Sequence, residues 1–202
     1  NDKWLGCKDL VSRQSFITEG SICHYSWYVP HDIDALVERM GGKAEFERRL
    51  DMMFALKDSS SAARLLYWHG NEPCHQIPFL YSYIGKPEKS KRVVDNILKT
   101  EYNDTPGGLS GNDDAGQMSA WYMFAAMGFY PVCPSTPYYI IGAPSFDRVT
   151  FNLENKKQFE IIRQKSINNS NFVRFILNGK QLDNCQLSHG DIINGGKLIV
   201  EE

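Results

Sequence analysis

Several features that would point to particular protein classes are missing from this chain of 202 residues. Its five cysteines form no Cys-x-x-Cys pair, which argues against a zinc ribbon, and their odd number in a chain this long does not imply a disulfide framework. No run of about 18 apolar residues occurs, so no membrane-spanning helix is expected. The formal net charge of -2 gives no electrostatic reason to expect binding to nucleic acid or to an acidic membrane.

The start of the chain also lacks two expected signals. It begins with Asn1 rather than with methionine, and no basic start followed by an apolar run is visible. We therefore expect the sequence to begin inside a longer protein. With 42% hydrophobic residues, it can still bury a core of its own.

Hydrophobic periodicity predicts helices over roughly the first 130 residues. Apolar residues recur there at the i, i+3, i+4, i+7 spacing of an amphipathic helix, and glycines or a proline follow several of the periodic segments. Short connections between successive helices predict antiparallel helix pairs. The five periodic segments span 33–40, 46–54, 77–84, 94–98 and 118–125.

The pattern changes after Pro131. Apolar and polar residues then alternate over 149–153, 159–161 and 173–177, which predicts strands. Asn178-Gly179 predicts a two-residue hairpin, because both turn positions need positive φ. Helices and strands in separate blocks predict an α+β chain with two units: helical hairpins over 1–133, and an antiparallel β module over 134–202, a sandwich or part of one.

Glu19 is the first candidate for chemistry. It lies between a short apolar stretch and Gly20, with several aromatic residues close in sequence. A carboxyl group beside aromatic rings loses hydration, which raises its pKa and suits it to donate a proton. An exposed loop glutamate would explain the same residues. His31 and Asp32 follow just before the helix that starts at Ile33, where Asp32 could contribute to a site or cap the helix.

A second candidate segment combines two histidines, an amide and a carboxylate. His69 and His75 do not have the spacing of a helical zinc motif. The oxygen donors Asn71 and Glu72 suit calcium better, because calcium prefers carboxylate, amide and carbonyl oxygens. Alternatively, Glu72 precedes Pro73 at the start of a helix and complements the helix dipole.

The third candidate segment is a glycine-rich turn that ends in Asn112-Asp113-Asp114. Its composition is that of a calcium loop, but its spacing is not that of an EF-hand. Both carboxylates precede a predicted helix, where negative charge is favourable, so both could cap it. Since adjacent side chains point in different directions, one could instead serve chemistry while the other anchors the turn.

Together these segments resemble glycoside hydrolase family 92, the calcium-dependent α-mannosidases. The resemblance covers about residues 16–153 in order, and the strand-rich tail fits the terminal strands of that family. Its motifs are long and specific. The matching runs are Thr18-Glu19-Gly20, Tyr28-Val29-Pro30-His31-Asp32, Met40-Gly41-Gly42, Gly70-Asn71-Glu72-Pro73, Gly111-Asn112-Asp113-Asp114, Gly116-Gln117-Met118-Ser119-Ala120-Trp121, Gly128-Phe129-Tyr130-Pro131-Val132 and Gly142-Ala143-Pro144.

The resemblance implies a fold and an activity. The helices would form the later part of an (α/α)6 barrel, completed by a missing N-terminal part of the same enzyme that also carries a β-sandwich domain. The implied reaction is hydrolysis of terminal α-linked mannose with inversion, by an exo-mannosidase of the α-1,2 type acting on mannose-containing glycans. The implied location is periplasmic, extracellular or at the cell surface.

The resemblance also assigns roles to residues. Glu19 matches the general acid, and the base lies in the Gly-Asn-Asp-Asp turn, with Asp114 as first choice and Asp113 as second. Asn71 and Glu72 match a motif at the site of the calcium ion, which binds mannose hydroxyls and helps to distort the ring. Further substrate contacts are expected from His75, Gln76, Asn112, His31 and Asp32.

Two departures from the family pattern affect specificity. Asn112 stands where some members carry another acid, so a base built from two carboxylates is not implied here. Cys23-His24-Tyr25 stands where many members carry a Trp-Gln pair before the tyrosine, so the linkage preference does not transfer. A non-catalytic carbohydrate-binding module remains an alternative, since the aromatic residues and the asparagine-rich tail are compatible with it.

Overall fold

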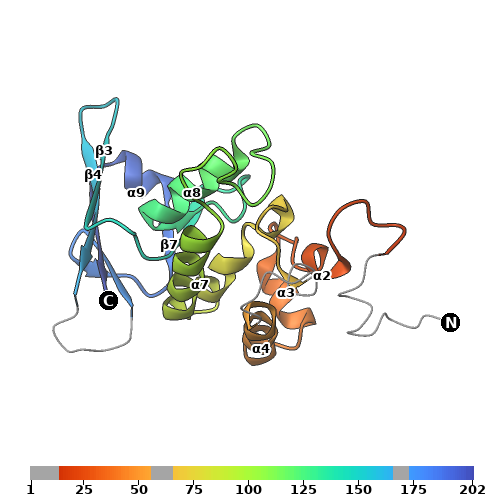
Figure 1. The fold of residues 1–202 in the computed structure, drawn as a ribbon. Coiled ribbons are helices and arrows are strands. Elements are labelled where there is room, and N and C mark those ends of the chain that lie inside the picture. Colours follow the sequence, from red (N-terminus) through yellow and green to blue (C-terminus); the bar gives the residue numbers. More distant parts are fainter. Residues whose placement is uncertain (1–13, 56–65, 166–172) are drawn as a thin grey trace.

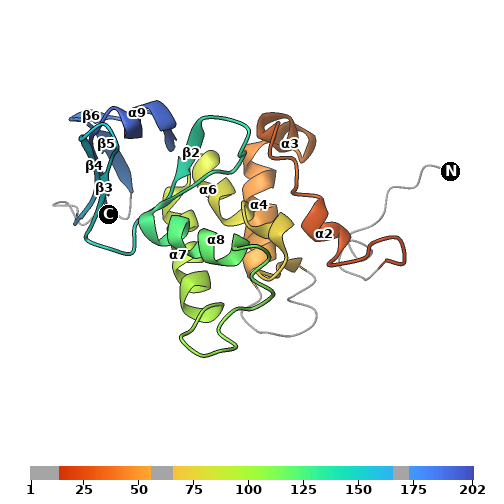
Figure 2. The ribbon, with the colours of Figure 1, turned by 90° about the horizontal axis from the view of Figure 1, so that it is seen from above.

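The computed structural model describes residues 14–55, 66–165 and 173–202 (Figure 1). Helices α2 to α4 fill one end of the molecule and the sheet that contains β3 and β4 the other, with α7 and α8 between them (Figures 1 and 2). The helices are α2 (Ile22–Tyr25), α3 (Ile33–Arg39), α4 (Lys43–Phe54), the 3₁₀ turns η1 (Glu72–Cys74) and η2 (Ile77–Phe79), α6 (Leu80–Tyr83), α7 (Pro87–Thr100), α8 (Gln117–Met127) and α9 (His189–Ile193).

Most of the predicted helices are confirmed. Helix α3 starts where Asp32 Oδ1 accepts a hydrogen bond of 3.0 Å from Ala35 N, so Asp32 is an N-cap. Helix α8 ends at Gly128, whose φ of 95° gives the left-handed C-cap that glycine favours. The helix predicted over 77–84 is wrong in detail. Pro78 lies in the 3₁₀ turn η2, and only Leu80–Tyr83 continues as α-helix.

A helical core holds these elements together. Phe46 and Leu50 of α4 are fully buried, and Trp27 packs edge-on against Phe46 with ring centroids 5.1 Å apart. Trp121 of α8 is also fully buried and lies edge-on to Phe79. The same cluster includes Val94 and Ile97 of α7, so it joins the predicted second, fourth and fifth helices.

The strands form two sheets. One has the order β1-β2-β7 and the other β3-β4-β8-β5-β6. The predicted hairpin at Asn178-Gly179 is confirmed, with φ of 50° and 86° between β5 and β6. The strands are β1 (Phe129–Tyr130), β2 (Tyr138–Ile141), β3 (Arg148–Asn152), β4 (Gln158–Gln164), β5 (Arg174–Leu177), β6 (Lys180–Gln181), β7 (Gln186–Ser188) and β8 (Gly196–Glu201).

The prediction of a purely antiparallel module is wrong. Strand β8 pairs antiparallel with β5 but parallel with β4, so the larger sheet is mixed. A parallel pair needs a long crossover, and the segment between β4 and β8 supplies one that includes β5, β6, β7 and α9. Helix α9, which the strand pattern missed, starts at a capping box made by Ser188 and Asp191.

Both sheets contribute to one sheet core. Phe129 and Leu187 come from the smaller sheet, while Phe159 and Leu198 come from the larger one. Strand β1 precedes the predicted boundary at 133/134, and that division into units stays a prediction. The sheet core consists of Phe129, Ile141, Ala143, Phe159, Ile161, Phe175, Cys185, Leu187, Ile192, Leu198 and Val200.

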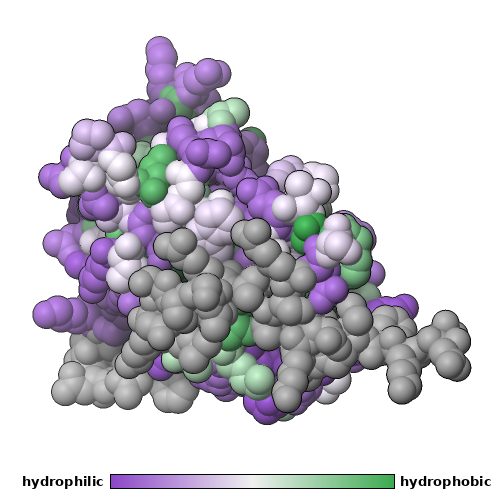
Figure 3. Space-filling model, turned by 45° about the vertical axis from the view of Figure 1, so that its right-hand side comes forward, coloured by the Kyte–Doolittle hydropathy of each residue, from purple (hydrophilic) through white to green (hydrophobic). Residues whose placement is uncertain are grey.

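On one face of the molecule, apolar side chains lie as separate spots among polar ones in the described part of the surface (Figure 3). Phe16, Tyr28 and Met123 are among the large hydrophobic residues that are more than half exposed. Within the described ranges 14–55, 66–165 and 173–202, no helix is both long and apolar enough to cross a membrane.

Candidate active site

Three segments singled out in the sequence meet in the structure through glycines. A Cβ atom at Gly111 would lie 2.7 Å from Gly70 Cα, so these two backbones are in direct contact. Gly20, with φ of 76°, lies against the side chain of Asn71, because a Cβ atom there would come 2.6 Å from Asn71 Nδ2. The segments of Glu19, Glu72 and Asp114 therefore surround one place.

The carboxyl groups of these segments interact. Burial raises the pKa of Glu72 above its usual value, and a side-chain hydrogen bond with Asp114 raises it further. A backbone hydrogen bond opposes this rise, while the negative charges of Asp114 and Glu19 add to it. Glu19 and Asp114 themselves are exposed, and Glu72 is half-buried. Two solvent-facing carboxylates thus flank a more shielded one, an arrangement suited to acid and base chemistry.

The two adjacent aspartates have different environments. Asp113 Oδ1 accepts hydrogen bonds from Ser119 N (3.0 Å) and Ser119 Oγ (2.8 Å), which anchors the turn to the first turn of α8. Asp114 has a φ of 45° and turns toward Glu72 instead. Asn112 is exposed beside them. Asp113 therefore holds the turn, and Asp114 is left available for chemistry.

Asn71 and Glu72 carry buried oxygens without partners. Among the described residues, Asn71 Oδ1 and Glu72 Oε1 have no hydrogen-bond donor, although Asn71 Nδ2 lies 3.0 Å from His24 Nδ1. Amide and carboxylate oxygens of this kind are ligands that calcium prefers, but it takes about six to eight of them. Within the described part of the chain, no group of three His, Cys, Asp or Glu side chains could hold a metal ion. The pair fits an open calcium site that substrate or water oxygens complete.

His75 and Gln76 lie behind this site rather than in it. The side chains are 1% and 4% exposed, respectively. His75 Nε2 bonds to His69 O at 2.9 Å, and Gln76 Nε2 donates to Trp27 O at 3.1 Å. Burial lowers the pKa of His75 to about 4, so its imidazole is neutral at pH 7. Their geometry does not support the predicted contacts with a sugar, and both side chains instead hold the backbone.

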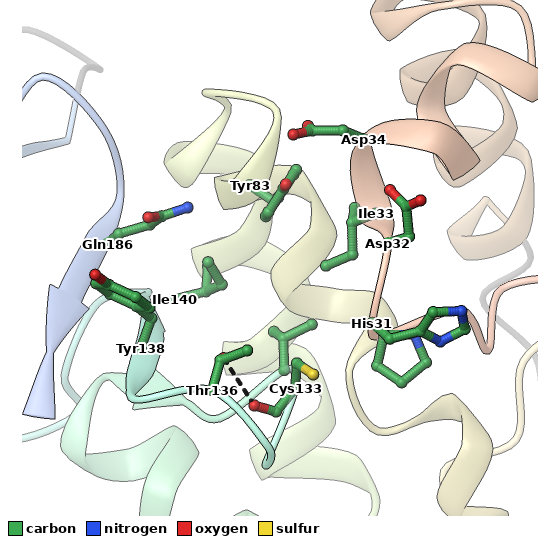
Figure 4. Close-up of a pocket in the computed structure, with 12 residues that line it drawn as sticks. His31, Asp32, Ile33, Asp34, Tyr83, Cys133, Thr136, Tyr138, Ile140 and Gln186 are labelled. Atoms are coloured by element: carbon green, nitrogen blue, oxygen red, sulfur yellow. Dashed lines mark hydrogen bonds between the residues drawn. The ribbon is translucent and has the colours of Figure 1, made fainter.

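His31 and Asp32 line a different cleft, of about 210 Å³ (Figure 4). The two residues and Asp34 form one wall, while Tyr138 and Gln186 of the smaller sheet face them across the opening. Because Asp32 Oδ1 is the cap of α3, its role in the structure is local. The structure does not bring this pair together with Asp114.

Sequence reasoning missed a part-buried network next to the site. Tyr67 Oη lies 2.8 Å from His69 Nδ1, and Tyr102 Oη lies 2.7 Å from His69 Nε2. Tyr102 also donates to Met118 O at 3.1 Å, which connects the network to α8. Tyr102 comes after a helix and belongs to no motif, so nothing in the sequence singles it out.

Comparison with solved structures finds the same fold. A family 92 α-mannosidase from Bacteroides thetaiotaomicron, in complex with mannoimidazole, is 40% identical with a TM-score of 0.79, over 92% of this chain and 25% of that one. The family 92 inverting mannosidase from Bacteroides thetaiotaomicron VPI-5482 is 34% identical with a TM-score of 0.79, over 100% of this chain and 29% of that one. The mixed fold of helices and sheets is thereby confirmed.

A curated relative from Arthroderma benhamiae is described as an uncharacterized secreted glycosidase. It is 32% identical over 193 residues, which make up 94% of this chain and 24% of the relative. The chain thus spans about a quarter of the length of these relatives. Residues 1–201 match the glycosyl hydrolase family 92 catalytic domain. The resemblance predicted from the sequence motifs is confirmed, and the chain belongs to glycosyl hydrolase family 92.

Proposed function

We propose that the natural protein carrying this chain hydrolyses terminal α-linked mannose from glycans. The observation that carries the proposal is the convergence of Glu19, Glu72 and Asp114 on one place, where Gly111 contacts Gly70 and Gly20 contacts the Asn71 side chain. Two similar solved structures are those of mannosidases, and one of them contains mannoimidazole. Because the chain spans about a quarter of those enzymes, the activity is proposed for the complete protein.

The proposed reaction is a single displacement with inversion. Glu19 donates its proton to the glycosidic oxygen as the bond from that oxygen to the anomeric carbon breaks. Asp114 accepts a proton from a water molecule whose oxygen forms the new bond on the opposite face of the sugar. This mechanism needs the two carboxyl groups to be about 6.5–9.5 Å apart, which leaves room for the water. Support for inversion comes from the similar mannosidase described as inverting.

Calcium is the proposed cofactor, with Asn71 and Glu72 among its ligands. Within the part of the chain that the structure describes, one buried oxygen of each side chain has no hydrogen-bond donor, which supports this assignment. When bound, calcium would contribute charge stabilisation and contacts to mannose hydroxyls that favour a distorted ring. Burial and Asp114 raise the pKa of Glu72. A bound cation beside its carboxyl group would favour the ionised form.

The finer fold and the location belong to the same proposal. The helices up to residue 133 would complete an (α/α)6 barrel with helices from another part of the same enzyme, and residues 134–202 would form a separate β module. A location outside the cytoplasm is supported by the curated relative described as secreted.

The deciding experiment replaces the proposed acid. Glu19→Gln in the complete protein should lower kcat about 10²–10⁴-fold on mannobiosides, whose leaving groups need protonation. The loss should be much smaller on an activated aryl mannoside, because its leaving group departs without a proton. Glu38→Gln, at an exposed glutamate of α3, is the matched control and should keep full activity. Full activity of Glu19→Gln on mannobiosides would contradict the assignment.

Two further arms test linkage and metal. A panel of α1,2-, α1,3- and α1,6-linked mannobiosides identifies the preferred bond, and the same panel with a chelator tests calcium. Mannose release that a chelator leaves unchanged would exclude the calcium proposal. Glycan binding without any mannose release would instead favour a non-catalytic carbohydrate-binding module.

A further inference from the structure

We infer that Tyr102 is a positioning residue of the proposed mannosidase site. Its hydroxyl group links His69, next to the segment of Asn71 and Glu72, to helix α8, which comes directly after the turn of Asp114. The inference rests on the proposed function and adds to it a residue that touches neither substrate nor the reacting atoms.

The directions of the hydrogen bonds can be deduced by counting hydrogens. Tyr102 Oη donates its single hydrogen to Met118 O, so it must accept the bond that it shares with His69 Nε2. His69 Nε2 therefore carries the proton, and His69 Nδ1 accepts from Tyr67 Oη. His69 is buried, which agrees with a neutral ring. The chain of bonds has one direction only, from Tyr67 to Met118.

These bonds tie both proposed catalytic segments to the same turn of α8. Met118 is the second residue of α8. Ser119, the next residue, donates a backbone hydrogen bond to Asp113 Oδ1. The turn that carries Asp114 and the segment that carries Glu72 are thus attached one residue apart. Since the attachments are directional and those of Tyr102 are part-buried, they fix the distance between the two carboxyl groups more tightly than apolar packing would.

A second tie holds the other end of the Glu72 segment. Gln117 Nε2, at the start of α8, lies 3.1 Å from His75 Nδ1, while His75 Nε2 bonds to His69 O. Because Nε2 donates to a carbonyl, Nδ1 of this neutral ring accepts from the Gln117 amide. The segment from residue 69 to residue 75 is therefore fastened to α8 on both sides of Glu72.

Two tyrosines on the same imidazole provide a matched pair of variants. Tyr102→Phe removes the hydroxyl that reaches α8, while the ring can stay stacked on Trp121, with centroids 6.0 Å apart. Tyr67→Phe removes the hydroxyl on the opposite nitrogen of His69, and this ring packs on Phe54. Both changes delete one part-buried hydroxyl group that bonds to His69, but only the first cuts the link from His69 to α8.

The experiment measures kcat, KM and thermal unfolding of the complete protein with an α-mannobioside. Tyr102→Phe should lower kcat at least about tenfold while KM changes about threefold or less, since small displacements of catalytic groups cost rate. Both variants should lower the unfolding temperature by similar amounts, because each loses one hydrogen bond to His69. Tyr67→Phe should nevertheless keep kcat within about threefold of the unaltered protein. An unchanged kcat in Tyr102→Phe, or an equal loss in both variants, would overturn the inference.

Two outcomes need separate arms. If Tyr102→Phe does not fold, Gln117→Leu takes its place, because it cuts the second tie; an unchanged kcat there would count against positioning. If the unaltered protein releases no mannose, the proposed function fails, and crystal structures of the unaltered protein and Tyr102→Phe decide instead. The distance between the Glu72 and Asp114 carboxyl carbons should then change by more than about 0.5 Å, and an unchanged distance would overturn the inference.

Discussion

Gly111 lies against Gly70 so closely that a Cβ atom at Gly111 would come within 2.7 Å of Gly70 Cα. A Cβ atom at Gly70 would in turn lie 2.6 Å from Ser110 O. The obstacles are backbone atoms, which cannot rotate away as a side chain can. This contact joins the segment of Glu72 to the segment of Asp114, so the convergence of the two segments depends on two residues that carry no side chain.

Gly111→Ala should therefore separate the two segments. We expect a loss of about 1–3 kcal/mol in the free energy of unfolding, as in other overpacked sites, together with reduced mannoside hydrolysis. Gly107→Ala is the control in the same loop, because a Cβ atom there would meet nothing within 4 Å. Urea unfolding and kcat measurements on both variants test this, and equal losses at the two positions would contradict it.

Periodicity located the helices that bury one face and failed where burial is complete. Helix α4 alternates buried and exposed residues, so its apolar stripe is visible in the sequence. Residues 74–82 are buried at every position, so no polar face marks the period. The break between the turn at Pro78 and helix α6 could not be read from such a pattern. Alternation in strands likewise reports which face is buried, not the direction of the partner, so the parallel pairing of β8 was not predictable.

The convergence of Glu19, Glu72 and Asp114 was expected from the ordered motifs, but the split between buried and exposed side chains was not. A histidine three residues after a glutamate looks the same in sequence whether it contacts a ligand or supports the backbone. For His75 the difference is set by Gln117 and His69, and for Gln76 by a carbonyl of Trp27 49 residues away. Such partners depend on tertiary packing and leave no local signal.

The two aspartates of the turn should respond differently to the same substitution. Asp114→Asn should lower kcat about 10²–10⁴-fold, because an amide cannot take a proton from water. Asp113→Asn should keep most activity, since an amide oxygen can still accept from Ser119 N. Asparagine also tolerates the left-handed backbone of residue 114, so neither variant should unfold. Steady-state kinetics check this, and the reverse order of losses would make Asp113 the base.

His75 should make stability depend on pH. Burial lowers its pKa in the folded state to about 4, from a usual value of 6.5. The unfolded chain therefore binds more protons between these values, so stability is fully present above about 6.5 and declines as pH falls toward 4. The difference between the two pKa values corresponds to roughly 3 kcal/mol of unfolding free energy. His69, whose pKa is also lowered, adds to this dependence on pH.

Urea unfolding of the unaltered protein and of His75→Gln at several pH values between 4 and 7 measures this contribution. Glutamine can still donate to His69 O but does not titrate, so the variant should lose less stability on acidification. A pH dependence as steep as that of the unaltered protein would assign the effect to other groups.

Strand β8 should be the most sensitive part of the larger sheet. It lies between β4 and β5, and Leu198 is fully buried in the sheet core, whereas Ile199 points to the opposite, half-buried face. Leu198→Ala should cost about 2–5 kcal/mol of unfolding free energy, because it removes buried methyl groups and leaves a cavity. Ile199→Ala changes the neighbouring residue of the same strand and should cost clearly less. Denaturant unfolding tests the pair, and equal losses would mean that the two faces of β8 are equally packed.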